Sequence, residues 1–425
     1  MDTKQSQAAE IAISERVRSQ YSQAPFPPVS FFPIESGAPK QPIWLYSFTE
    51  AYYHAFRILR KPAGMRLLDA GCGTGHGVRQ IRHLAPGAEV HACDFSAKSL
   101  AHARKRIKAL GEGPVTFHEM SLLDLSALPG QFDAIFCSGV IHHTANPVRA
   151  LQQLKSKLKP DGVLYLMLYS QFGRRPTILM QQAIKLLSQN SNDQQEGLRL
   201  GRLLFDALPP MNPIATWERE KWQNNHRKHA EAFIDMYVNA NEKNYSIREV
   251  HDDLAAAGLK FVRFSNPQAW TLAERMAAQP EIIERFAALP ELERFEFIEH
   301  LFPDQDQYLF FATHAENQMT MPEWASGVTF SGREDQLTAT RSMFAQELKP
   351  ATPPQPNTAL WRGYFGRTAR LDPLTIELLG CCDGRQSIKK IAEDWEQAHG
   401  PKLQGKGVHA IRMMEHHGLI YTTNM

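Results

Sequence analysis

The feature that most constrains this chain is the regular alternation of short apolar runs with helix-length segments between Met65 and Tyr169. The apolar runs have the length of buried strands, and the segments between them have helical spacing. Such strand–helix–strand units favour parallel pairing, so they predict a doubly wound α/β domain with a mostly parallel sheet. The predicted strands of this stretch are Arg66–Ala70, Glu89–Asp94, Val115–Glu119, Phe132–Ser138 and Val163–Tyr169.

Two later strands complete a predicted seven-stranded sheet. A helix that begins near Ser246 and ends at Gly258 leads into the strand Lys260–Phe264, and Gln307–His314 is predicted as a last, edge strand. The helix-biased region 174–241, which is rich in Gln and Asn, interrupts the rhythm after the fifth strand and is interpreted as an inserted cap. A second helical insertion is predicted at 273–306.

The remaining segments define the predicted domain organisation. Residues 1–60 are expected to form an N-terminal helical lid segment, and residues 61–316 the α/β domain with its two insertions. The stretch 317–358 has no clear period and carries several prolines, which is typical of a linker. Residues 359–425 contain three short helical patterns and a strand-like end, which predicts a small winged-helix-like domain.

The composition narrows the location and the partners. The chain has 47 Lys and Arg against 45 Asp and Glu and no basic block, so nucleic acid is not the favoured partner. Its longest apolar stretch, Gly162–Tyr169, is far shorter than the roughly 20 residues of a membrane-spanning helix. The five cysteines are an odd number, and the only close pair is adjacent in sequence. We therefore expect a reduced, cytoplasmic protein without membrane attachment.

A glycine-rich turn follows the first strand, in the stretch Asp69-Ala70-Gly71-Cys72-Gly73-Thr74-Gly75. Glycines let the backbone approach a ligand closely, and the helix that follows offers free N–H groups. A nicotinamide dinucleotide site needs glycine at the sixth position of the turn, where this chain has His76. In addition, the charge of Asp69 would repel a pyrophosphate but attract an ammonium group. The turn therefore points to S-adenosylmethionine, with Asp94 at the second strand end accepting hydrogen bonds from the ribose and Phe95 covering the adenine.

From Met65 to Tyr169 these motifs resemble the class I S-adenosylmethionine-dependent methyltransferases. The resemblance implies that the turn from Gly71 to Gly75, with Cys72 and Thr74 in it, lines the methionine and ribose. It also implies that Leu123 and Asp124 bracket the adenine, and that the backbone of Ser138 and Gly139 lies near the methionine end.

Two narrower resemblances concern the rest of the chain. Several segments, including Gln20-Tyr21 and Asp235–Gly258, resemble a bacterial methyltransferase subgroup, which supports the chemistry without naming a substrate. The stretch Leu371–Tyr421 loosely resembles the winged-helix peptide-recognition domains of peptide-modifying enzymes. A DNA-binding winged helix and a dimerisation module, hence a homo-oligomer, remain alternatives for this stretch.

His142 is the best single candidate for a catalytic residue, because an imidazole can take a proton from a hydroxyl or an amine. Alternatively, His142 and His143 only shape the pocket floor, since methyl transfer can proceed by proximity and orientation alone. No metal is predicted. Tyr21 and Tyr46, from an aromatic cluster with Trp44, Tyr52 and Tyr53, are predicted to touch the ligand. The predicted source of substrate contacts in the cap is Trp217, Trp222, His226 and Tyr237.

The sequence thus predicts a methyltransferase that moves a methyl group to an oxygen or nitrogen acceptor on a small molecule or peptide. A non-catalytic protein that binds a peptide or protein partner through its C-terminal domain is the alternative. An NAD-dependent oxidoreductase is a second enzyme alternative.

Calorimetric titration with S-adenosylmethionine and with NAD separates these readings. We expect micromolar binding of S-adenosylmethionine that is lost in Asp94→Ala, because the carboxylate is expected to hold the ribose. Binding of NAD instead, or of neither ligand, would contradict the interpretation of the glycine-rich turn.

Overall fold

The computed structural model of the chain describes residues 3–28, 46–56, 58–111, 113–318, 337–341, 359–362, 368–371, 373–416 and 420–424. The chain divides into two compact units. The first unit consists of Met1–Ala51, Pro62–Val262 and Leu292–Gln318, and the second of Tyr52–Lys61, Arg263–Glu291 and Met319–Met425. Each unit is therefore assembled from separate stretches of the chain.

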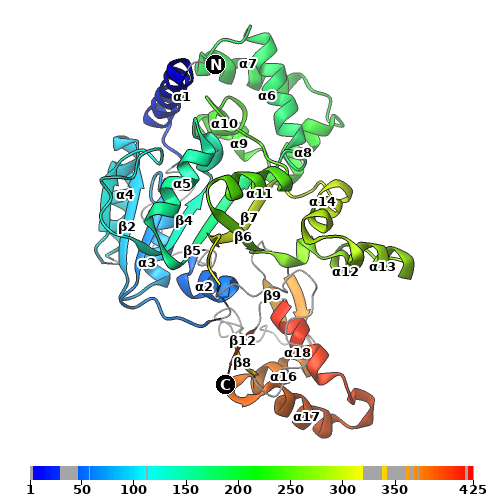
Figure 1. Cartoon of the computed structure of the whole chain (residues 1–425). Helices are drawn as coiled ribbons and strands as arrows, with labels where there is room; N and C mark the ends of the chain where they lie inside the picture. The colour runs from blue at the N-terminus through cyan, green and yellow to red at the C-terminus, as the bar shows by residue number, and fades with distance from the viewer. Residues whose placement is uncertain are drawn as a thin grey trace. The chain divides into compact units, whose positions relative to one another are not determined.

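A seven-stranded, mostly parallel sheet carries the fold (Figure 1). Its strand order is β3-β2-β1-β4-β5-β7-β6, with β7 antiparallel to β5 and parallel pairing from β3 to β5. The predicted doubly wound α/β fold is confirmed. The strands are β1 Arg66–Ala70, β2 Glu89–Asp94, β3 Thr116–Glu119, β4 Phe132–Ser138, β5 Leu158–Tyr169, β6 Leu259–Phe264 and β7 Gln307–His314.

The strand order reverses at β1. The chain continues from β1 to β2 and β3 on one side, and then to β4 and β5 on the other side. The loops that follow β1 and β4 therefore diverge at the carboxyl edge of the sheet. In doubly wound sheets this divergence leaves the crevice in which ligands bind.

The position of Gln307–His314 differs from the prediction. This segment forms β7 between β5 and β6, and β6 is the edge strand of the sheet. Tyr308 and the residues 310–314 are buried, whereas half of β6 is only partly buried. A nearly continuous apolar run is typical of a strand covered on both faces, so the run itself was compatible with an inner position.

Helices α3 His76–Leu84, α4 Ala97–Leu110, α5 Pro147–Lys157 and α11 Ile247–Ala256 connect the strands of the first unit. Side-chain caps start three of them. Ser96 accepts a hydrogen bond from the backbone of Ser99 at α4, and Asn146 accepts one from that of Arg149 at α5. At α11, Ser246 and Glu249 form a reciprocal capping box, which confirms the predicted start of this helix.

Five helices lie between β5 and α11, in the region where a cap was predicted: α6 Arg175–Leu187, α7 Gln194–Ala207, α8 Pro213–Trp222, α9 Asn225–Lys228 and α10 Ala230–Tyr237. They gather near α1 Thr3–Gln23, at the top of Figure 1. Met180, Ile184, Phe205, Phe233 and Tyr237 belong to an apolar core that these helices enclose among themselves. The insertion therefore has a core of its own, separate from the packing on the sheet.

Arg174 ties the entry of this insertion to its exit. Its guanidinium donates to both carboxylate oxygens of Glu242, at 3.1 and 3.0 Å, and to Oδ1 of Asn244 at 3.2 Å. It also lies over the ring of Tyr169, with 3.6 Å between Cζ and the ring centroid. Arg174 and Glu242 are both buried, so each charge depends on the other for compensation.

The second unit contains a three-stranded antiparallel sheet of β11 Asp383–Ser387, β8 Leu337–Arg341 and β12 Ile420–Asn424, in that order. Its central strand β8 comes from the stretch that was predicted as a linker. Helices α16 Pro373–Cys381, α17 Ile388–His399 and α18 Gly407–His416 pack around Leu378, Ile391 and Trp395. The winged-helix assignment stays a prediction.

Further elements are α2 Phe48–Phe56, η4 Pro267–Trp270, α12 Leu272–Arg275, α13 Pro280–Ala288, α14 Glu291–Leu301, β9 Ala359–Arg362, β10 Thr368–Leu371 and η5 Pro401–Leu403.

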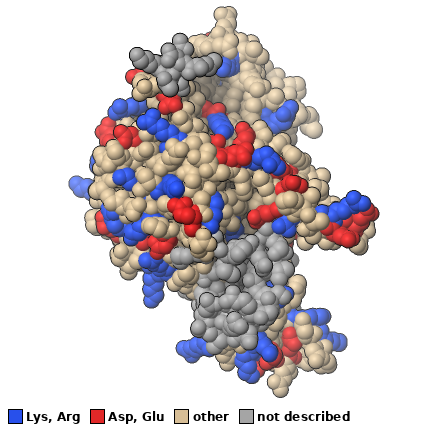
Figure 2. Space-filling view, viewed as in Figure 1, with Lys and Arg blue, Asp and Glu red and all other residues tan. Residues whose placement is uncertain are grey.

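Charges of both signs are interspersed over the face of the molecule shown in Figure 2. This distribution agrees with the formal net charge of +2. Among the residues that the structure describes, no helix is both long enough and apolar enough to cross a bilayer.

We expect Arg174→Ala to lower the free energy of unfolding by about 3–5 kcal/mol, because it leaves the buried carboxylate of Glu242 uncompensated. Urea denaturation followed by circular dichroism measures this loss. Arg199→Ala is the matched control, since Arg199 pairs with Glu196 in an exposed position and should leave the unfolding midpoint unchanged. Equal midpoints for wild type and Arg174→Ala would contradict the role given to Arg174.

Candidate functional site

The glycine-rich turn after β1 has a backbone that requires glycine. Gly71, Gly73 and Gly75 have φ values of 79°, 51° and 86°, in the left-handed region that other residues rarely adopt. A Cβ on Gly71 would lie 2.4 Å from a methyl carbon of Val140, and one on Gly73 would lie 2.3 Å from the carbonyl oxygen of Phe26. The turn therefore packs closely against the loop after β4 and against the segment that follows α1.

Asp94 holds this turn against the end of β2. Its Oδ2 accepts a hydrogen bond from the backbone N–H of Gly73 at 2.9 Å, and its Oδ1 accepts one from that of Ser96 at 2.8 Å. Burial raises the pKa of Asp94, and these hydrogen bonds to the ionised form oppose the rise. Each carboxylate oxygen keeps a second lone pair, so Asp94 can still accept from a ribose hydroxyl.

Asp69 is the last acid of β1 and is buried next to the turn. Its Oδ2 has no hydrogen-bond partner within the described part of the chain. Burial, followed by the charge of Asp94, raises the pKa of Asp69 to about 8. A buried carboxyl with an unused oxygen fits the ammonium group of a methionine moiety, which would supply both a donor and a compensating charge.

A cavity of about 250 Å³ opens at this edge of the sheet. Its lining comes from the ends of β1, β2 and β4 and the loops after β1 to β4, from the end of β5, and from α1 and α10. Nine of the thirteen residues predicted for the site line it: Asp69, Gly71, Cys72, Gly73, Asp94, Phe95, Leu123, Ser138 and Gly139. The structure thus brings residues from four separate loops to one cavity.

Thr74 and Gly75 do not line this cavity. The hydroxyl of Thr74 donates to the carbonyl oxygen of Pro27 at 2.8 Å, and the backbone N–H of Thr74 donates to the carbonyl oxygen of Phe26 at 3.2 Å. A Cβ on Gly75 would lie 2.8 Å from Cα of Ala103 on α4. Thr74 and Gly75 therefore support the turn without lining the cavity.

Asp124 also lies away from the cavity. Its side chain is exposed, and Oδ1 accepts a hydrogen bond from the backbone N–H of Ser126 at 3.0 Å. Hydrogen bonds from the side chain and then from the backbone of Ser126 lower the pKa of Asp124. The cavity wall at this point consists of the four residues Met120, Ser121, Leu122 and Leu123. The position of Asp124 thus does not support the predicted contact with the adenine amino group.

The two adjacent histidines have different surroundings. His142 lies outside the cavity lining, with its ring stacked on Tyr169 at 3.9 Å between centroids. Neither of its ring nitrogens has a hydrogen-bond partner among the described residues, and burial lowers its pKa well below the usual value. His143 lines the cavity, and its Nδ1 is 2.9 Å from the carbonyl oxygen of Asn241. The geometry therefore favours His143 over the predicted His142 as the base.

Of the predicted aromatic cluster, Tyr21 and Tyr46 line the cavity, whereas Tyr52 and Tyr53 are buried in α2 outside its lining. Trp44 lies outside the described residues. The hydroxyl of Tyr21 donates to Oδ1 of Asp235 at 2.8 Å, which brings α1 and α10 together at the cavity. Asp235, on α10, also lines the cavity and was not among the predicted site residues.

The four cap residues predicted to contact substrate pack on one another instead. Trp222 lies between Trp217 and His226, with centroid distances of 6.2 and 4.7 Å. The hydroxyl of Tyr237 donates to Oε2 of the buried Glu218 at 2.5 Å, and Nδ1 of His226 is 3.3 Å from the same oxygen. None of the four lines the cavity.

Comparisons with known proteins agree with this site. Residues 68–164 match the family model described as "Methyltransferase domain". An uncharacterised protein of Synechococcus sp. is 36% identical over 304 residues, which are 71% of this chain and 72% of that protein. A ubiquinone biosynthesis O-methyltransferase of Xanthomonas axonopodis pv. citri is 27% identical over 204 residues, 45% of this chain and 82% of its own.

The solved structure of PKMT2 from Rickettsia typhi in complex with AdoHcy has the same fold. It superimposes with a TM-score of 0.61 at 14% identity, over 91% of this chain and 77% of that chain. The glycine turn, the unused oxygen of Asp69 and the position of Asp94 all fit S-adenosylmethionine. The chain therefore belongs to the class I S-adenosylmethionine-dependent methyltransferases, in one family with the Synechococcus protein, and S-adenosylmethionine is its cofactor.

Proposed function

We propose that this methyltransferase acts on an oxygen or nitrogen nucleophile of a small molecule or peptide, at the end of the cavity where Tyr21, His143 and Asp235 meet. When bound, S-adenosylmethionine supplies an electrophilic methyl carbon on a sulfonium. We assign the ammonium to Asp69, the ribose to Asp94 and the adenine to Phe95 and Leu123. The remaining wall is then free for an acceptor.

The observation that carries this proposal is the hydrogen bond between His143 and Asn241. A carbonyl oxygen can only accept, so Nδ1 of the neutral imidazole must carry the proton. Nε2 then has the free lone pair, on a residue that lines the cavity. Asp235 interacts electrostatically with His143, and its negative charge would stabilise the imidazolium that forms when Nε2 takes a proton. This arrangement supports His143 as the general base.

The acceptor classes have different support. The name of the Xanthomonas relative supports an oxygen acceptor on a small molecule. The second unit supports a peptide, because a winged-helix-like domain with a sheet edge, such as that of β11 or β12, could hold an extended segment. We keep the domain boundaries predicted from the sequence as part of this proposal, except that the predicted linker 317–358 contributes the central strand β8 to the second unit. We also propose a cytoplasmic location, consistent with the five free cysteines.

An acceptor screen tests the proposed function directly. Purified protein with methyl-labelled S-adenosylmethionine is incubated with panels of phenols, amines and short peptides, and S-adenosylhomocysteine formation is followed. Formation that depends on one panel would support methyl transfer to that class. Transfer only to a thiol or a carbon acceptor would contradict the proposal.

We expect Asp69→Asn to weaken S-adenosylmethionine binding by about tenfold or more, because a charge-assisted hydrogen bond to the ammonium is lost. The same change should stabilise the cofactor-free protein at pH 8 relative to wild type. In the folded wild type the pKa of Asp69 is about 8, so folding takes up a proton between about pH 4 and 8, and stability falls as the pH rises through this range. Calorimetry and thermal melts at pH 5 and pH 8 measure both effects.

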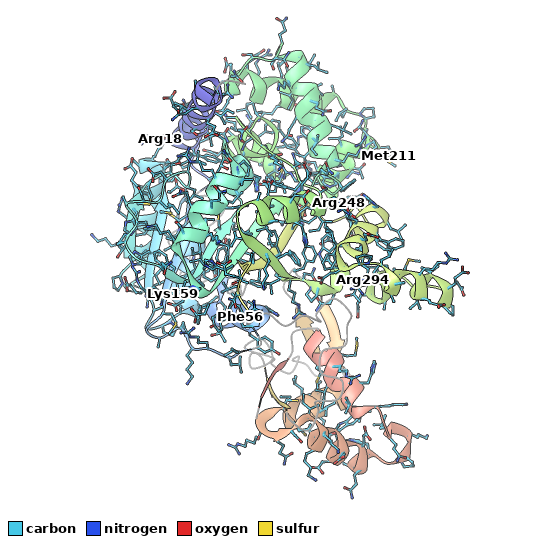
Figure 3. All side chains as sticks on the ribbon, viewed as in Figure 1. Arg18, Phe56, Lys159, Met211, Arg248 and Arg294 are labelled. Atoms are coloured by element: carbon cyan, nitrogen blue, oxygen red, sulfur yellow. The ribbon has the colours of Figure 1, made fainter. Side chains whose placement is uncertain are left out.

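Asp133→Asn is the matched control for that variant. Asp133 is also a buried carboxylate, but it accepts from Lys159 at 2.8 Å and lies outside the cavity lining; Lys159 is labelled in Figure 3. We expect Asp133→Asn to lower the free energy of unfolding and to leave the affinity for S-adenosylmethionine unchanged. A cofactor affinity that is the same in Asp69→Asn and wild type would refute the ammonium contact.

We expect His143→Asn to lower the rate of methyl transfer by about 10²–10⁴-fold, with S-adenosylmethionine affinity nearly unchanged, because only the general base is removed. The rate of wild type should rise with pH, because a general base acts only in its unprotonated form, and this dependence should vanish in the variant. The readout is the pH profile of kcat with the acceptor found in the screen. If His142→Asn removed the pH dependence and His143→Asn did not, the base would be His142.

A further inference from the structure

The charge of the cavity lining is one-sided. Among the residues that the structure describes, the lining contains three carboxyl groups, those of Asp69, Asp94 and Asp235, and no lysine or arginine. Of its two histidines, His76 is neutral near pH 7, because burial lowers its pKa to about 4. The proposed function assigns two of these carboxyl groups, those of Asp69 and Asp94, to the binding of the cofactor. The third, Asp235, interacts with His143 and has no part in binding the cofactor.

Asp235 is buried without a direct countercharge. Only 4% of its surface is exposed, and its Oδ1 accepts from the neutral hydroxyl of Tyr21 at 2.8 Å. Among the described residues, no lysine or arginine forms an ion pair with it. The nearby cation, Arg174, is occupied by both oxygens of Glu242. A buried carboxylate held by a neutral donor alone is costly, and a cationic ligand would offset that cost.

Aromatic rings surround this carboxylate. The ring of His143 lies between Tyr21 and Tyr169, with centroid distances of 6.1 and 5.7 Å, and both tyrosines line the cavity. Tyrosine rings attract ammonium groups through their electron-rich faces. The ring of Tyr169 is already covered by His142 and by the guanidinium of Arg174. Asp235 together with the ring of Tyr21 has the chemistry of an ammonium-binding site.

We propose that the Tyr21–Asp235 pair selects an amine as the methyl acceptor, bound as its ammonium beside Asp235 and the ring of Tyr21. This inference rests on the proposed function and narrows its acceptor from oxygen or nitrogen to nitrogen. Asp235 is a specificity residue in this scheme, and His143 keeps the role of base.

The reaction balances with these residues. The ammonium gives one proton to Nε2 of His143, and the nitrogen lone pair attacks the methyl carbon as the C–S bond breaks towards sulfur. The products are S-adenosylhomocysteine and a protonated methylamine, so the positive charge moves from sulfur to nitrogen, beside Asp235. A carboxylate is suited to stabilise charge that develops at that point. An ionised hydroxyl would bring a second negative charge next to Asp235, and a carboxylate acceptor would do the same.

Sinefungin tests the proposal without a known acceptor, because a carbon replaces the sulfur of the cofactor and carries an amino group in place of the transferred methyl. By calorimetry we expect sinefungin to bind wild type more tightly than S-adenosylhomocysteine. In Asp235→Asn its affinity should fall about tenfold or more, whereas that of S-adenosylhomocysteine should change less than twofold. Glu299→Gln is the matched control, since Glu299 is a buried carboxyl outside the cavity, and both affinities should be kept.

A second measurement uses acceptor fragments. The complex with S-adenosylhomocysteine is melted with n-butylamine, n-butanol or butyrate at equal concentration. We expect the amine to raise the melting temperature most, and Asp235→Asn to abolish its advantage. Equal effects of amine and alcohol, a larger effect of butyrate, or a sinefungin affinity insensitive to Asp235→Asn would overturn the amine assignment. Failure of S-adenosylhomocysteine itself to bind would instead refute the cofactor site on which the proposed function rests.

Discussion

The carboxylate of Asp94 sets the geometry on which the rest of the site depends. It joins the glycine turn to the end of β2 by accepting from Gly73, and it fixes the chain leading into α4 by accepting from Ser96. With β2 and the turn locked together, the backbone of the turn packs against Val140 after β4 and Phe26 after α1. One buried carboxylate thereby links three loops at the point where the strand order reverses, and the cavity forms between them.

The acceptor end of the cavity depends on a different kind of constraint, which acts between parts of the chain that are far apart in sequence. Tyr21 and Asp235 are 214 residues apart and meet through one hydrogen bond. The insertion that carries Asp235 is anchored where it leaves and rejoins the sheet, because Arg174 binds Glu242 and covers Tyr169. On α1 itself, Arg18, which is labelled in Figure 3, forms an exposed ion pair with Glu119 of β3. An exposed pair of this kind contributes little to stability, so the buried contacts of α1 determine its position.

Most of the residues predicted for the cofactor half lie together at one cavity, and for a physical reason. Strand periodicity and strand ends are local, so Asp69, Gly71, Asp94 and Gly139 could be placed at one sheet edge from the sequence alone. The acceptor half depends on contacts that no local pattern reports. His142 and His143 are neighbours in a single turn of 3₁₀ helix, η3 Ile141–His143, and only the turn of the backbone decides which ring reaches the cavity. For the same reason the apolar run of β7 predicted a strand but not its place beside β5.

The three carboxyl groups of the cavity, those of Asp69, Asp94 and Asp235, make ligand binding depend on charge, which apolar packing would not do. All three are buried and line one cavity, and burial, followed by the charge of Asp94, raises the pKa of Asp69 to about 8. With the proposed contact between the ammonium and Asp69, cofactor binding would offset the cost of these buried carboxyl groups by bringing two cations, the ammonium and the sulfonium, into the cavity. After transfer the sulfur is neutral, so the carboxylates attract the spent cofactor less strongly than its precursor. The same residues that favour binding before the reaction therefore favour exchange of the cofactor after it.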